Sequence, residues 1–92
     1  EFLYKRDTPI DMEEIFVNED SWVVNREIKD LHLRDRLKVS IIGITEEKGR
    51  FIQMPRGTMS ITANSKLLLV GSQKGIVRAK KIINLTKKPE DI

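Results

Sequence analysis

Residues 64–76, NSKLLLVGSQKGI, have types and spacing that could form an anion site. An apolar strand would lead through Gly71 and Ser72 into a helix, and the free N–H groups at the start of a helix attract anions. The glycine spacing, however, matches neither of the phosphate-binding patterns GxxxxGK[ST] and GxGxxG. We therefore expect a structural turn, with Gly71 at the end of the strand and Ser72 as the helix N-cap.

His32 is the only histidine, and its neighbours include Asp30, Arg34 and Asp35. One imidazole beside carboxylates does not have the spacing of a zinc site, and the chain has no cysteine to supply a thiolate. We expect a charged, solvated segment here. The sequence predicts no metal site and assigns no role to His32.

Adjacent acidic residues occur at 13–14, 19–20 and 46–47. Neighbouring residues of a strand point to opposite faces, so such pairs do not converge on one substrate atom. Catalysis would also need a nucleophile beside a base, or two carboxylates with separated pKa values. The sequence offers neither arrangement, so we expect no enzyme, no catalytic residue and no cofactor.

Charge is distributed unevenly along the chain. Acidic residues gather in 1–20, whereas 74–88 hold only basic ones: Lys74, Arg78, Lys80, Lys81, Lys87 and Lys88. This asymmetry suits either two complementary ends of one fold or dimer, or an anionic partner. The few aromatic residues are scattered, unlike a stacking platform for bases. Trp22 would fill the core or anchor a partner.

Ninety-two residues, of which 39% are hydrophobic and 34% charged, suit one soluble domain. No apolar run is long enough to cross a bilayer. The chain begins with Glu1 and not with methionine, so we expect a fragment of a longer protein. We expect residues 1–12 to form an arm from that parent, 13–86 a regulatory domain and 87–92 a tail.

The first half of the chain predicts two strands joined by helical turns. Residues 14–18 form a first strand, and residues 25–33 form one or two helical turns with Asn25 as N-cap. Residues 38–45, KVSIIGIT, form a strand with apolar side chains on both faces, so both faces would be covered. A loop with Gly49 at positive φ then leads to a hairpin partner at 51–54.

The second half predicts short strands at 59–62 and 67–70, followed by an amphipathic helix that begins at Ser72. Its apolar face consists of Ile76, Ala79, Ile82 and Ile83. Together these elements predict an α+β fold. It would have a small mixed or antiparallel sheet, one short helix after the first strand and an amphipathic C-terminal helix.

Two stretches resemble the C-terminal lobe of the regulator-of-potassium-conductance domain, also called the TrkA-C domain. In 21–44, SWVVNREIKDLHLRDRLKVSIIGI, Ile28 and Leu31 stand at two leucine positions of the family, before a strand rich in Val and Ile. In 61–76, Gly71 occupies the last glycine of the second family motif. Pro55 stands where the family often has a proline after its hairpin.

The chain departs from the family pattern at two turns. Asn25 replaces a glycine, and Asn64-Ser65 replaces Gly-Asp. Asparagine is the residue other than glycine that best tolerates left-handed backbone, so we expect both turns to be kept. Ser65 would cap the second turn in place of the aspartate.

The resemblance implies a cytoplasmic regulatory domain of a membrane-embedded potassium channel or transporter. Family members follow a nucleotide-binding lobe, and several form homodimers that bind small effectors such as divalent cations or cyclic di-AMP. No effector residue can be carried over to this chain. We expect Phe51, Ile52 and Met54 to contribute to a dimer surface.

Two other functions stay open from the sequence. One is a small basic nucleic-acid-binding domain that uses Lys74, Arg78, Lys81 and Lys88, although the scattered aromatics do not favour it. The other is a metabolite-sensing domain of an enzyme, since such enzymes also use small α+β dimers.

Overall fold

The computed structural model describes residues 10–92. In that part of the chain the elements follow one another as β1 (Ile10–Phe16), η1 (Ile28–Leu31), η2 (Leu33–Leu37), β2 (Val39–Thr45), β3 (Phe51–Gln53), β4 (Lys66–Ser72) and α1 (Gln73–Ile82). Here η1 is a 3₁₀ turn and η2 is a π-helical turn. This is the α+β fold that the sequence predicts, and its sheet is antiparallel.

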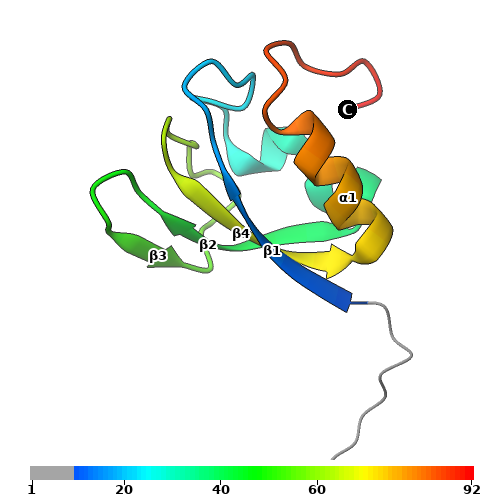
Figure 1. Ribbon diagram of the computed structural model, residues 1–92, viewed down its shortest axis with the longest axis horizontal. Coiled ribbons are helices and arrows are strands. Elements are labelled where there is room, and N and C mark those ends of the chain that lie inside the picture. The colour runs from blue at the N-terminus through cyan, green and yellow to red at the C-terminus, as the bar shows by residue number, and fades with distance from the viewer. Residues whose placement is uncertain (1–9) are drawn as a thin grey trace, which may run out of the picture.

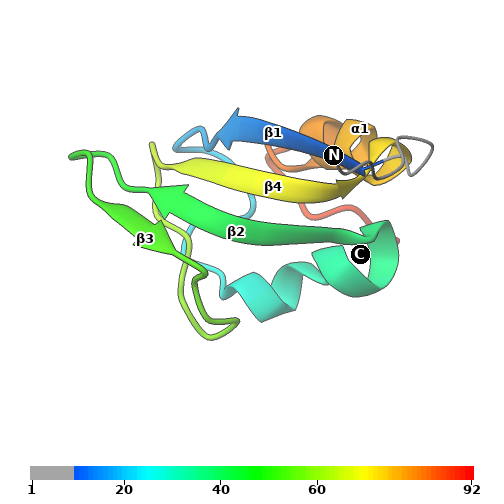
Figure 2. The ribbon, with the colours of Figure 1, turned by 90° about the horizontal axis from the view of Figure 1, so that it is seen from below.

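The sheet has the strand order β1-β4-β2-β3. The helix α1 and the connecting segments cover one of its faces, whereas the other face is uncovered, as Figures 1 and 2 show. Alternate side chains of each strand therefore meet different surroundings. Ile15, Leu67 and Leu69 are buried in the core, but Met12 and Phe16 are exposed on the uncovered face.

Strand β2 contains a β-bulge at Ile42. Ile41 and Gly43 pair with consecutive residues of β4, so Ile42 has no partner there. The extra residue shifts the alternation of side chains. As a result Ile44 is buried on the core side together with Val39 and Ile41. The expectation that both faces of this strand are covered was therefore wrong.

The helix α1 packs on the sheet through the apolar face that its spacing predicts. Ile76, Ala79, Ile82 and the following Ile83 are all buried. At its start the Ser72 hydroxyl accepts a hydrogen bond from the Gly75 N–H at 3.0 Å. This bond satisfies one of the free N–H groups of the first turn.

The loop after β1 packs against the end of α1. Trp22 is buried, and its indole Nε1–H donates to the Ile82 carbonyl oxygen at 2.8 Å. The Ser21 hydroxyl donates to the Ile83 carbonyl oxygen. Arg26 lies over the Trp22 ring, 5.4 Å from its centroid. Trp22 is thus a core residue that also satisfies the last carbonyl groups of the helix.

Gly71 lies inside β4, opposite Val39, because the strand continues to Ser72 instead of ending at 70, so Gly71 and Ser72 form no separate turn. A Cβ atom at Gly71 would collide with the Lys38 carbonyl oxygen, and one at Gly75 would collide with the Leu37 carbonyl oxygen. Both glycines are required because β4 and α1 pass very close to the segment that joins η2 to β2.

The first strand begins and ends earlier than the sequence predicts, at Ile10 and Phe16 instead of 14 and 18. Residues 10–12, expected to belong to an arm, pair with β4. The polar residues Asp11 and Glu13 obscure the strand, because they share a face with buried Ile15. The rest of the expected arm, residues 1–9, lies outside the described residues.

The helical turns predicted at 25–33 are present as η1 and η2, which begin later, extend to Leu37 and are separated by His32 in left-handed backbone. Asn25 is not an N-cap, since its φ of 68° makes it a left-handed turn residue. Glu27 precedes η1, and its side chain makes no capping bond. The Asn25 N–H instead donates to the Ile61 carbonyl oxygen at 2.7 Å.

The predicted strand at 59–62 is also absent from the described sheet. Only Ser60 forms an isolated bridge, with Glu27. The Ile61 N–H donates to the Arg26 carbonyl oxygen at 2.9 Å, so this segment pairs with the loop before η1 and not with the sheet.

Residues 87–92, expected to form a tail, return to the domain. Ile92 is only 7% exposed and belongs to the hydrophobic core. The preceding Asp91 contacts both Arg36 and Arg78. The folded unit therefore extends to Ile92.

Candidate functional site

A groove runs along the outer edge of β2. β4 pairs with β2 on one side, but β3 pairs only with residues 43–45 on the other. Within residues 10–92, the outer edge of β2 before the bulge therefore has no neighbouring strand. There η1 and η2 lie beside β2, as Figure 2 shows, and enclose a groove of about 490 Å³. Its lining residues are Ile28, Lys29, His32, Leu33, Arg34, Asp35, Val39, Ser40, Ile41, Ile42, Met54, Pro55, Gly57 and Val70.

The groove has one mainly apolar wall and one wall of mixed character. The sheet side and the segment after β3 contribute Ile42, Met54, Pro55 and other aliphatic side chains. The η1–η2 side contributes apolar Ile28 and Leu33 together with basic Lys29 and Arg34 and acidic Asp35. Apolar surface with a few convergent polar groups is the usual composition of a ligand site. This arrangement suits a ligand with apolar rings and negative charge.

Arg34 is the cation of the groove that is best placed to meet a ligand. The Lys29 ammonium lies 3.6 Å from Glu27 Oε1, and His32 Nδ1 lies 3.8 Å from Asp35 Oδ2. Within residues 10–92, Arg34 makes no ion pair. A guanidinium without an internal partner can bind an anion through two parallel hydrogen bonds.

Met54 has an unusual backbone and exposure for an apolar residue. Its φ is 50°, in the left-handed region, and its side chain is 64% exposed. The Met54 N–H donates to the carbonyl oxygen of bulged Ile42 at 2.9 Å. Strained backbone of this kind is found at ligand and interface sites, where another requirement outweighs its cost. Met54 is thus hydrogen-bonded to the bulged residue and lines the groove.

A comparison with family models matches residues 12–84 to the TrkA-C domain. The chain belongs to the TrkA-C domain family. The family match and the observed fold confirm the resemblance drawn from residues 21–44 and 61–76. No curated protein sequence matches the chain.

Solved structures place this TrkA-C domain among the C-terminal domains of RCK proteins. It is similar to the RCK_C domain dimer of S. agalactiae BusR in complex with c-di-AMP, with 30% identity and a TM-score of 0.72. That similarity covers 84% of this chain and 94% of the BusR chain. A longer BusR chain, in complex with its busA-promotor DNA, has 25% identity and a TM-score of 0.71, over 91% of this chain and 42% of that one.

The fold also matches the RCK C domain of the potassium transport protein KtrA in complex with c-di-AMP. The identity is 24% and the TM-score is 0.69, over 78% of this chain and 81% of that one. At this identity the similarity establishes the fold alone.

The three residues predicted to form dimer contacts of this TrkA-C domain do not share one surface. Met54 lines the groove. Phe51 is 54% exposed on the uncovered face of the sheet, where its ring lies over Gly43. Ile52 is partly buried and pairs with Ile44. Only Met54 therefore belongs to the candidate site.

The predicted turn residues occupy the positions that need unusual backbone. Asn25, Asn64 and Gly49 have φ angles of 68°, 63° and 97°. The Ser65 hydroxyl donates to the Thr62 carbonyl oxygen at 2.7 Å and so supports the second asparagine turn. These residues shape the TrkA-C fold and do not line the groove.

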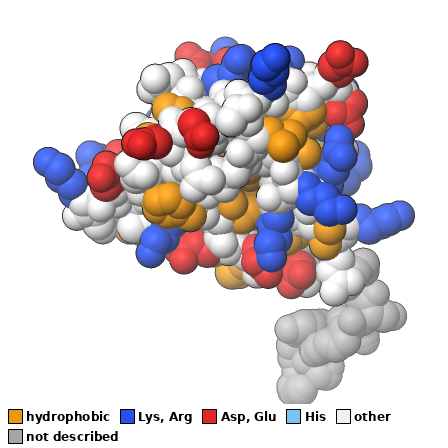
Figure 3. Space-filling model, turned by 45° about the horizontal axis from the view of Figure 1, so that its top comes forward, with side chains coloured by type: hydrophobic (Ala, Val, Ile, Leu, Met, Phe, Trp, Pro, Cys, Tyr) orange, Lys and Arg blue, Asp and Glu red, His pale blue; other side chains and the backbone are white. Residues whose placement is uncertain are grey.

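The basic face of α1 is partly neutralised by the rest of the domain. Lys80 lies 3.4 Å from Glu13 of β1, and Arg78 lies 2.7 Å from Asp91. On the face that Figure 3 shows, acidic and basic side chains are interspersed, with small apolar patches between them. The contact between Lys80 and Glu13 agrees with the view that the acidic and basic ends of the chain complement each other.

Residues 10–92 contain no group of three or more His, Asp or Glu side chains that could hold a metal ion. In the same range no helix combines the length and the apolar character that crossing a bilayer requires. The groove at β2, and not a metal cluster, is thus the candidate site of the described chain.

Sequence reasoning did not find the groove, because its residues come from separate parts of the chain. Arg34 and Ile42, for example, lie on opposite walls. Two signals were present in the sequence: Pro55, which ends the hairpin, and the charged segment around His32, Arg34 and Asp35. Neither indicates which residues face each other.

Proposed function

We propose that this TrkA-C domain is a non-enzymatic regulatory domain that dimerises and senses an effector. It would lie in the cytoplasm and control potassium transport by an attached channel or transporter. We further propose that the groove at β2 binds a cyclic dinucleotide. The observation that carries the proposal is the 30% identity to the BusR RCK_C dimer, which is in complex with c-di-AMP. The potassium role rests on membership of the TrkA-C family.

The chemistry of the groove suits such a ligand. A cyclic dinucleotide has two flat bases and two phosphates, so it needs apolar surface and cations within one site. Ile42, Met54 and Pro55 offer the apolar surface, and Arg34 and Lys29 offer the cations. A volume of about 490 Å³ is within the usual range for a small-molecule site.

A second copy of the domain would complete the site. The outer edge of β2 lacks a strand neighbour, and the exposed Met54 side chain stands beside it. Exposed apolar groups next to an open sheet edge favour association. Two copies related by a two-fold axis would bring their grooves together, so that one symmetric ligand contacts both.

Regulation then follows from linkage between ligand binding and dimer arrangement. The ligand shifts the equilibrium between two arrangements of the dimer by the difference between its affinities for them. Its two phosphates neutralise the Arg34 side chains that would otherwise repel across the two-fold axis. The dimer would pass this change to whatever the parent chain attaches to the domain.

Isothermal titration of c-di-AMP into the 92-residue chain tests this assignment. We expect binding that Arg34→Gln weakens about tenfold or more, since a charge-assisted hydrogen bond is lost. Arg50→Gln serves as the matched control. Arg50 is also exposed and pairs with Glu46 at 3.8 Å in the hairpin loop, but it does not line the groove.

Absence of c-di-AMP binding to the wild-type chain would refute the ligand assignment. Equal losses for Arg34→Gln and Arg50→Gln would mean that general charge and not the groove binds the nucleotide. A titration with 5′-AMP separates recognition of the cyclic dinucleotide from recognition of adenine alone.

A second candidate function is the ligand-sensing part of a DNA-binding regulator. The BusR chain in complex with promotor DNA supports it, at 25% identity over 91% of this chain. This chain spans only 42% of that BusR chain, so DNA contact there need not involve the similar part. The two functions share the same effector site. The segments that flank this domain in its full-length protein, a nucleotide-binding lobe or a DNA-binding domain, decide between them.

A further inference from the structure

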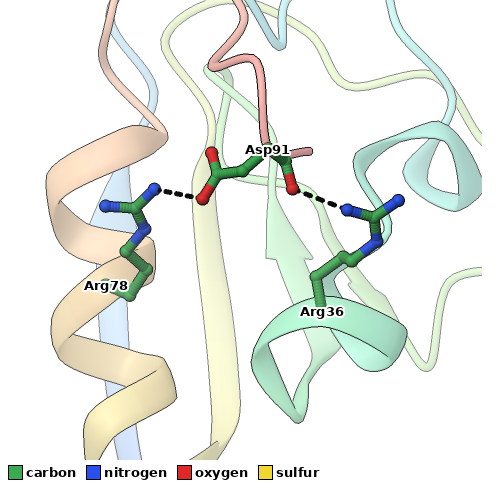
Figure 4. Close-up of polar contacts among 3 residues, drawn as sticks. All are labelled: Arg36, Arg78 and Asp91. Carbon is green, nitrogen blue, oxygen red and sulfur yellow. Dashed lines mark hydrogen bonds and ion pairs between the residues drawn. The ribbon is translucent and has the colours of Figure 1, made fainter.

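The last residues of the chain connect two elements that do not otherwise share a polar contact among the described residues. The carboxylate of Asp91 accepts a hydrogen bond from Arg78 Nη2 of α1 at 2.7 Å. The main-chain carbonyl oxygen of the same residue accepts one from Arg36 Nη1 of η2, also at 2.7 Å. Figure 4 shows Asp91 between the two guanidinium groups. Ile92 then enters the core and is 7% exposed.

The element that Arg36 belongs to forms one wall of the groove. Leu33, Arg34 and Asp35 of η2 all line it. Arg36 points instead toward the C-terminal segment, as Figure 4 shows. A contact with Arg36 therefore acts on the side of η2 that faces away from the groove, and it does not occupy the groove.

η2 depends on packing for its position, since Leu33 is 4% exposed and Leu37 packs against the core. It has five residues, and it lies between His32 and Lys38, whose φ angles of 52° and 60° are left-handed. No side chain caps its start. A single helical turn is not stable by itself, so its position depends on neighbouring contacts. The contact from Asp91 to Arg36 is one of these.

We propose that residues 89–92 form a strap that holds the η2 wall in its binding position, so that release of the strap lowers the affinity of the groove. The part that concerns affinity rests on the proposed function, whereas the part that concerns wall position does not. The side chains of Arg78 and Asp91 are 42% and 65% exposed. An exposed pair contributes little to global stability, so the polar contacts of Asp91 can open while Ile92 stays in the core and the fold persists.

Hydrogen exchange and titration with c-di-AMP test the strap together. Arg36→Gln removes the contact between the strap and η2 and leaves Ile92 in place. Deletion of residues 89–92 removes the whole strap. We expect the amides of 33–37 to exchange about tenfold faster in both variants, with the rest of the chain unchanged in Arg36→Gln. The affinity for c-di-AMP should fall by about fivefold or more.

Lys80→Gln is the matched control, because Lys80 also makes an exposed ion pair from α1, to Glu13 of β1. It should change neither measurement. Unchanged exchange at 33–37 in Arg36→Gln would overturn the strap, and so would a change in exchange spread evenly over the chain. If the wild-type chain fails to bind c-di-AMP, the proposed function is refuted, and exchange at 33–37 still decides the strap.

Discussion

At the scale of single residues, Met54 brings together two features that an isolated domain would not favour. An exposed apolar side chain gains little from folding, and left-handed backbone costs a residue other than glycine about 1 kcal/mol or more. Met54 has both, with 64% exposure and a φ of 50°. The proposed contact of Met54 with a ligand or a second copy would account for both costs.

Met54→Gly separates these two roles. Glycine relieves the left-handed strain and removes little buried surface, so we expect the free energy of unfolding in urea to be unchanged or to rise by up to about 1 kcal/mol. Self-association and affinity for c-di-AMP should both fall. Asn64→Gly is the control, since Asn64 has a similar φ of 63° outside the groove. A large loss of stability in Met54→Gly would show that the side chain serves the core.

The sequence indicated where asparagine would replace glycine in left-handed turns, because that tolerance is a property of the residue itself. It could not indicate Met54, since nothing about methionine favours a positive φ. The strain there comes from the bulge at Ile42, whose carbonyl oxygen accepts the Met54 N–H. Local preference predicts a residue only where no tertiary contact overrides it.

At the scale of elements, the start of α1 lies against the segment that joins η2 to β2. Gly75 has no room for a side chain, because a Cβ atom would collide with the Leu37 carbonyl oxygen. This contact fixes the helix relative to the wall of the groove. A substitution at Gly75 can distinguish this steric contact from helix propensity, because the two change the stability of the domain in opposite directions.

Gly75→Ala is expected to destabilise the domain by about 1–3 kcal/mol through overpacking. Helix propensity alone would stabilise the same variant by about 1 kcal/mol. Urea unfolding measures the sign. Gly57→Ala should be close to neutral, since the nearest atom to its Cβ would be Lys29 Cβ at 3.4 Å. An increase in stability for Gly75→Ala would contradict the close approach of α1 to Leu37.

Elements with a regular apolar pattern were predictable, and elements held by distant partners were not. α1 has buried residues at helical spacing, so its position in the sequence was clear. Strand β1 has only Ile15 as a buried apolar residue. Its position in the fold otherwise depends on its pairing with β4. The strand expected at 59–62 does not join the sheet, because the hydrogen bonds of this segment go to the loop around Asn25 and Arg26.

At the scale of the whole molecule, the fold class and the family follow from the sequence, but the groove does not. The family pattern consists of core and turn residues, so it identifies the scaffold. The groove forms where β2 extends beyond β3 and two short helical segments fill part of the gap. The C-terminal strap likewise depends on Arg36 and Arg78, which are far apart in the sequence.

The proposed dimer links this architecture to regulation. In the proposed dimer each copy would supply only one side of the ligand contact, because the ligand would lie between two grooves. Ligand binding and association should therefore strengthen each other, because a ligand that binds only the dimer stabilises it by mass action. A site complete within one copy would not show this coupling.

Sedimentation velocity of the 92-residue chain at micromolar concentration, with and without c-di-AMP, tests this central claim most directly. The account predicts that c-di-AMP shifts the chain from monomer toward dimer, with roughly one nucleotide bound per two chains. A chain that stays monomeric with saturating c-di-AMP, or that binds one nucleotide per monomer, would contradict it.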